Sequence, residues 1–86
     1  ISETQNALDI QLLSNPVKNS LEIRSEKTIR DAGLKIFNAE GKLMSLQHSN
    51  LNAGSNSIDV NALSAGIYFL KITSGKKSST LRFVKF

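Results

Sequence analysis

The chain has 86 residues, of which 40% are hydrophobic and 21% charged, and this composition is that of one globular domain with a small core. It contains no cysteine, which excludes a disulfide framework and a Cys-ligated zinc site. The net charge is +4, and the longest wholly apolar run (residues 67–70) is far shorter than the roughly 18 residues of a membrane-spanning helix, so we expect no direct membrane insertion.

Residues 1–6 (ISETQN) are polar and show no periodicity. We expect them to be the end of a linker, with the domain itself at residues 7–86. The segment has neither the basic start nor the apolar stretch of a signal peptide. If the domain is exported, we expect the signal peptide to lie upstream in a longer chain.

Apolar and polar residues alternate in seven short runs, which is the pattern of half-buried strands. The runs are residues 8–12, 21–24, 34–36, 44–46, 58–60, 68–73 and 81–83. Between them lie turn-forming segments, among them SNPVKNS (14–20), NAEGK (38–42) and SGKKS (74–78). Strands at this spacing, without helical periodicity, predict an all-β sandwich or barrel.

Two of the predicted strands carry apolar residues on both faces. Ile67 and Phe69 have the opposite parity to Tyr68, and Val84 has the opposite parity to Phe83. A strand of this kind lies in the middle of a sheet, or something else covers its outer side.

The basic charge is concentrated toward the C-terminal end. Residues 1–59 contain six Lys and Arg and all seven acids, whereas residues 60–86 contain five Lys and Arg and no acid. The net charges are therefore −1 and +5. Two interpretations remain open at this point: a polyanionic partner, or solvated lysines that keep a sheet soluble and block edge-to-edge pairing.

Catalysis and metal binding find little support in the sequence. The only histidine, His48, lies near a predicted strand end, where a solvated side chain is the usual outcome. The acids are scattered over different strands and loops, and there is no nucleophile elbow or EF-hand loop. We expect no catalytic residue, no metal and no cofactor. No recognised module supports nucleic-acid binding either.

Four segments occur in a characteristic order: SNPVKNSLEI (14–23), LKIFNAEGKLM (34–44), LNAGSNSIDVNALSAGIYFLKI (51–72) and KKSSTLRFVKF (76–86). With this order, residues 8–86 resemble the type A C-terminal sorting domain of the type IX (Por) secretion system of Bacteroidetes. One small departure is Ser14, which stands where the family often has proline. The resemblance implies an immunoglobulin-like β-sandwich of seven antiparallel strands.

The resemblance also implies a function, which is that of an address label without enzymatic activity. An N-terminal cargo protein would pass through the periplasm, and the outer-membrane translocon would recognise this domain. A sortase-like peptidase commonly removes such a domain and attaches the cargo to the cell surface. The cargo would thus end at the cell surface or outside the cell.

We interpret the family-motif residues as mainly structural; they are Asn15, Pro16, Gly41, Lys42, Gly54, Gly66 and Tyr68. The family places the decisive part of the signal in the last strands. There we predict translocon contacts by Lys76, Lys77, Arg82, Phe83, Val84 and Lys85.

Two recognition mechanisms remain open. The translocon could bind the folded sandwich through its basic terminal strands, or the last strand could leave its sheet and add to an edge of the receptor. The folded version is favoured, because detaching Leu81 and Phe83 from a small core would cost several kcal/mol. If the last strand is an edge strand, it could also pair with a second copy and form a dimer.

Two other functions are compatible with a small β-sandwich. One is a carbohydrate-binding or adhesive module attached to a secreted enzyme, but such modules display aromatic platforms and this chain has no Trp and one Tyr. The other is a spacer domain of the fibronectin type III kind. A spacer should tolerate a position in the middle of a chain, whereas a C-terminal address should not.

Overall fold

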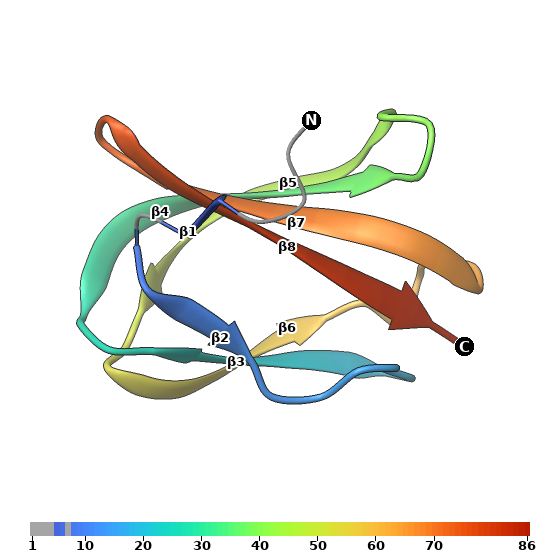
Figure 1. Cartoon of the computed structure of the whole chain (residues 1–86), viewed down its shortest axis with the longest axis horizontal. Helices are drawn as coiled ribbons and strands as arrows, with labels where there is room; N and C mark the ends of the chain where they lie inside the picture. The colour runs from blue at the N-terminus through green and yellow to red at the C-terminus, as the bar shows by residue number, and fades with distance from the viewer. Residues whose placement is uncertain (1–4, 7) are drawn as a thin grey trace.

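The computed structural model describes residues 5–6 and 8–86, which form strands connected by turns and loops (Figure 1). The strands are β1 (Gln5–Asn6), β2 (Ile10–Leu12), β3 (Ser20–Ser25), β4 (Ile29–Asn38), β5 (Leu43–Leu51), β6 (Gly54–Asp59), β7 (Gly66–Ser74) and β8 (Lys77–Lys85). The seven predicted runs correspond to β2–β8. The two-residue β1 comes from the segment predicted as linker, and the linker boundary at residues 6 and 7 stays a prediction.

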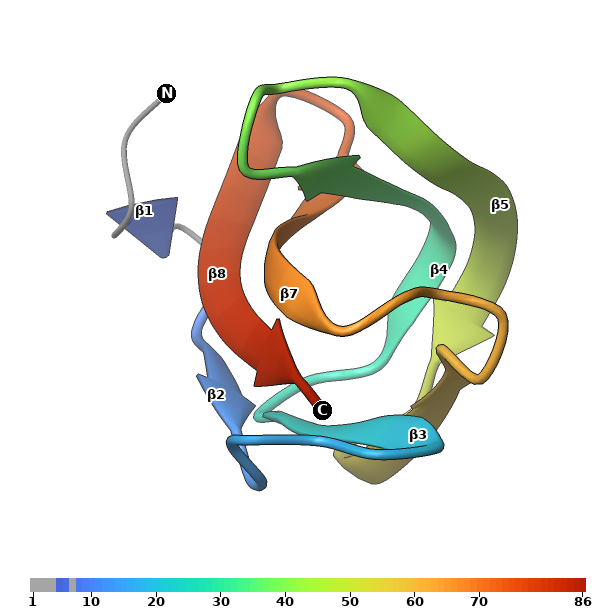
Figure 2. The same ribbon diagram turned by 90° about the vertical axis from the view of Figure 1, so that its right-hand side faces the viewer.

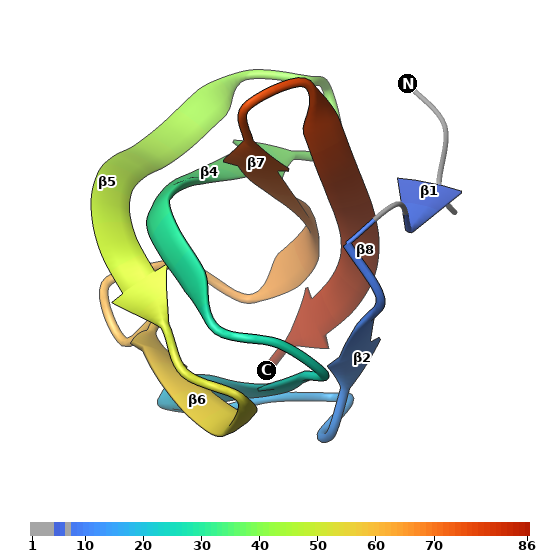
Figure 3. The same cartoon turned by 90° about the vertical axis from the view of Figure 1, so that its left-hand side faces the viewer.

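The strands form two antiparallel sheets. One has the order β1-β8-β7-β4-β5, and the other has the order β2-β3-β6. Figures 2 and 3 show the small sheet as a floor under the larger one, which curves over it. The expected all-β, seven-stranded antiparallel sandwich of the immunoglobulin-like type is confirmed, with β1 as a short addition beside β8.

The core lies between the two layers and follows the period-2 pattern of the strands. Leu21 and Ile23 of β3 belong to the same core cluster as Leu70 and Ile72 of β7, and all four side chains are fully buried. Phe83 of β8 joins them. These alternating positions are those that the sequence pattern assigned to one face of each strand.

Strand β5 departs from this pattern. Two of its inward-facing residues are polar, since Ser45 lies opposite Ile36 and Gln47 lies opposite Leu34, and only Leu51 at its end joins the core. Leu46 instead lies on the outer side and is 54% exposed. The sequence alternation at residues 44–46 thus predicts the strand correctly, but its apolar side faces solvent. The small sheet has only three strands, and none of them pairs with β5 in the described chain.

Candidate docking face

Strand register places nine apolar and basic side chains on the outer side of the larger sheet, alongside polar ones such as Thr73 and Thr80. Leu43, Phe37, Phe69 and Arg82 form one cross-strand row from β5 to β8. The neighbouring rows contain Leu46, Lys35 and Lys71 on one side, and Ile67 and Val84 on the other. We call this set the outer face: Lys35, Phe37, Leu43, Leu46, Ile67, Phe69, Lys71, Arg82 and Val84.

The apolar part of the outer face is not needed for the core. Leu43 is 45% exposed and Ile67 is 39% exposed. Phe37, Phe69 and Val84 are half-buried between their strand neighbours. Single exposed apolar residues are normal, but here they are neighbours across four strands, and such contiguous patches mark interaction surfaces.

The charged part of the outer face has one sign. Lys35 and Lys71 lie directly opposite each other on β4 and β7. Among the described residues, neither ammonium group has a carboxylate within ion-pair distance. Like charges directly opposite each other in an antiparallel pair are destabilising. The pair therefore does not stabilise the fold. The outer face also contains no acidic residue that would offset the repulsion between the two ammonium groups.

The outer side of the small sheet is different. Its cross-strand pairs are Ser20 with Asp59, Glu22 with Ser57 and Arg24 with Ser55. The Ser57 hydroxyl donates a hydrogen bond of 2.6 Å to Glu22 Oε2. This surface is polar and carries Glu22 and Asp59 together with Arg24, so the two outer sides of the sandwich differ in hydropathy and in net charge.

The structure separates the six predicted contact residues. Lys76 lies in the β7–β8 turn and Lys77 begins β8, both exposed. Arg82 and Val84 belong to the outer face. Lys77 and Lys85 are separated by eight residue steps, or about 26 Å of strand. The two lysines at the turn are therefore remote from the C-terminal end of the strand.

The other two predicted contact residues point inward. Phe83 is 0% exposed, and its ring stacks on that of Tyr68 with 5.6 Å between centroids. Lys85 is 8% exposed, opposite Gly66. In the folded domain neither presents its side chain broadly to a partner.

The loop before β3 holds the end of the chain. The Val84 N–H donates to Asn15 Oδ1 at 2.9 Å, and the Val17 N–H donates to the Val84 carbonyl at 2.7 Å. The Phe86 N–H donates to the Val17 carbonyl at 3.0 Å. We call these contacts the terminal clasp. The peptide bond between Asn15 and Pro16 is cis.

The remaining family-motif residues have local structural roles. Gly41 and Gly54 adopt positive φ values of 86° and 104° in loops, which glycine tolerates best. The Tyr68 hydroxyl donates to the Ser64 carbonyl at 2.7 Å. The Lys42 backbone exchanges hydrogen bonds with Asn38, while its side chain is exposed.

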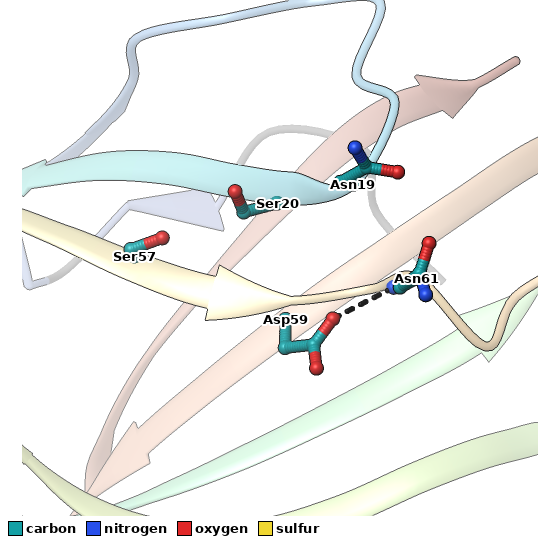
Figure 4. Close-up of a pocket in the computed structure, with 5 residues that line it drawn as sticks. All are labelled: Asn19, Ser20, Ser57, Asp59 and Asn61. Atoms are coloured by element: carbon teal, nitrogen blue, oxygen red, sulfur yellow. Dashed lines mark hydrogen bonds between the residues drawn. The ribbon is translucent and has the colours of Figure 1, made fainter.

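A polar depression of about 510 Å³ lies where β3 and β6 meet their loops (Figure 4). It is lined by Asn19, Ser20, Ser57, Asp59 and Asn61. Asp59 is the single ionisable residue of this lining, and its Oδ1 accepts a hydrogen bond from the Asn61 N–H. The arrangement offers hydrogen bonds to a solute but no nucleophile paired with a base.

No metal centre is formed by the part of the chain that the structure describes, since it contains no suitable group of three His, Cys, Asp or Glu. His48 Nδ1 lies 3.9 Å from Asp31 Oδ1, and both side chains are exposed. Among the described residues there is also no helix with the length and apolar character of a membrane span.

Sequence reasoning did not anticipate most of the outer face. Lys35, Phe37, Leu46 and Lys71 come from three strands, and only the pairing register places them together. The available signal was the second apolar parity of residues 67 and 69, which indicated a covered outer side.

Comparison with known proteins supports one family. The sequence profile described as "Secretion system C-terminal sorting domain" matches residues 11–85. A search of curated proteins finds no match to the chain.

Proposed function

The chain belongs to the family of secretion-system C-terminal sorting domains, and from this premise we propose which of its surfaces the type IX machinery reads. Membership makes it a sorting signal that acts on an attached N-terminal cargo, whose destination is the cell surface or the exterior. The alternative of a carbohydrate-binding module has no support from the family match.

We propose that an outer-membrane translocon component docks on the outer face of the folded domain. The observation that carries this proposal is the Lys35–Lys71 pair, which lies beside the half-buried rings of Phe37 and Phe69. A partner with an apolar surface rimmed by carboxylates would cover the rings and neutralise the two ammonium groups. Complementary charge of this kind sets specificity and speeds association.

Recognition of the folded domain is favoured over release of the terminal strand. Release would expose Phe83, and removing a buried Phe from a core typically costs about 3–5 kcal/mol. Total domain stabilities are only about 5–15 kcal/mol. Release would also break the terminal clasp, so a receptor that needs a free strand would have to overcome a large part of the stability of the domain.

Further elements of the export route are also proposals. The cargo passes through the periplasm before the outer membrane, and a sortase-like peptidase removes the domain afterwards. The domain itself acts by binding and performs no catalysis. A dimer would form through β5 and not through the last strand, because β5 is an edge strand whose nine residues include no Lys, Arg, Asp, Glu or Pro to oppose self-pairing. The edge of β8 is occupied by β1 and by the terminal clasp.

The test is charge reversal in a cargo fusion carrying this domain at its end. Lys35→Glu/Lys71→Glu is expected to leave the cargo in the periplasm while the purified domain still unfolds cooperatively. The matched control, Lys27→Glu/Arg30→Glu, makes the same change in charge at exposed positions outside the outer face and outside the loop before β3. Normal surface delivery of the folded outer-face variant would contradict the proposal.

A further inference from the structure

We propose that Asn15 and Val17 are positioning residues of the export signal, which is a composite of the loop at residues 14–19 and the chain end at residues 84–86. This inference rests on the proposed function. Its basis is the terminal clasp, which joins segments 69 residues apart in the sequence.

Both backbone polar groups of Val84 form hydrogen bonds in the terminal clasp. Its N–H donates to Asn15 Oδ1 and its carbonyl accepts from the Val17 N–H, so both groups point away from β7. Its side chain meanwhile lies on the outer face opposite Ile67. Phe86 continues the contact through its N–H to the Val17 carbonyl. The last residues are thus flanked by β7 on one side and by the loop on the other.

The loop is itself anchored in the core, because the Val17 side chain is only 2% exposed and belongs to the hydrophobic cluster. It therefore provides a fixed support for the terminus. Chain ends without such support commonly fray. A partner that docks on the outer face would then meet Val84 in one defined position rather than a mobile tail.

The contribution of Asn15 is an acceptor atom, which makes its role chemically testable. Aspartate keeps an oxygen at this position, whereas leucine keeps the approximate size and removes the acceptor. A single hydrogen bond is worth roughly 1 kcal/mol net, which corresponds to about a fivefold change in a local opening equilibrium. Asn15→Leu should increase the local opening equilibrium of the terminus by about this factor, and Asn15→Asp should leave that equilibrium at its wild-type value.

The experiment measures amide hydrogen exchange in the purified domain and surface delivery of a cargo fusion in cells. For Asn15→Leu we expect about fivefold faster exchange at Val84, unchanged exchange at buried Leu70, and slower delivery. Asn15→Asp should show the wild-type exchange rate at Val84 and the wild-type rate of delivery. Asn56→Leu is the matched control, because Asn56 holds a different loop through its contacts with Asn52. That variant should deliver cargo normally.

The outcomes separate the inference from the proposed function. Faster exchange at Val84 with undiminished delivery would overturn the composite signal while leaving the docking face intact. Delivery that is insensitive to Lys35→Glu/Lys71→Glu would instead overturn the docking face. If Asn15→Leu also accelerates exchange at Leu70, Asn15→Ala replaces it as the acceptor-free variant, and rescue by Asn15→Asp remains the decisive comparison.

Discussion

Lys35 and Lys71 lie directly opposite each other on the central strands of the larger sheet. A sheet built for stability alone would place a complementary or neutral pair there. The pair therefore costs the isolated domain some stability, and the proposed docking of a partner on this face gives that cost a function.

Relief of this repulsion should stabilise the domain. Lys35→Thr is expected to raise the free energy of unfolding by about 0.2–1 kcal/mol at low salt, because threonine suits a strand and removes one like charge. Urea unfolding measures the change. The gain should shrink at 1 M salt, where charges are screened. The exposed Lys27→Thr is the control, and an equal gain there would contradict a specific effect of the pair.

Two terminal phenylalanines should differ sharply in their effect on stability. Phe83→Ala should lower the free energy of unfolding by about 3–5 kcal/mol, because its ring is fully buried against Tyr68. Phe86→Ala should change it by less than about 0.5 kcal/mol, since Phe86 is 62% exposed. Thermal unfolding of both variants provides the measurement. A large loss in Phe86→Ala would mean that the last side chain also belongs to the core.

Gly33 has no room for a side chain. A Cβ atom there would lie 2.6 Å from Thr73 Oγ1 on the neighbouring strand. Gly33→Ala should therefore destabilise the domain by about 1–3 kcal/mol. Thr73→Ala removes the obstructing atom, so the double variant should recover most of this loss. A double-mutant cycle tests the coupling, and simple additivity of the two changes would disprove the proposed clash.

Self-association should respond to a charge on β5. Wild-type domain is expected to dimerise at high concentration in sedimentation experiments, and Leu46→Lys should weaken the dimer at least about tenfold, because the new lysines repel across the paired edges. Leu13→Lys places the same charge at an exposed position outside β5. A monomeric wild type at every concentration, or equal weakening by both variants, would exclude pairing through β5.

Much of the architecture could be predicted from local pattern. Alternation along residues 68–73 and 81–83 placed strands correctly, because one buried face requires an apolar residue at every second position. The same logic was less successful for β5, where Leu46 alternates with polar neighbours but faces outward. Alternation along a strand shows that its two faces differ in hydropathy. Which of the two faces is buried depends on the layer that packs against the sheet.

By itself, the sequence determined an all-β sandwich of seven strands, the excess of basic charge toward its end, and the family. The tertiary structure decided which residues act together. Lys35 meets Lys71 only through the β4–β7 register, and Asn15 meets Val84 only after the chain has closed a loop across 69 residues. The physical reason is that local periodicity is set by neighbours along the chain. Register and loop closure depend on strands that are distant in sequence and become neighbours only when the whole domain folds.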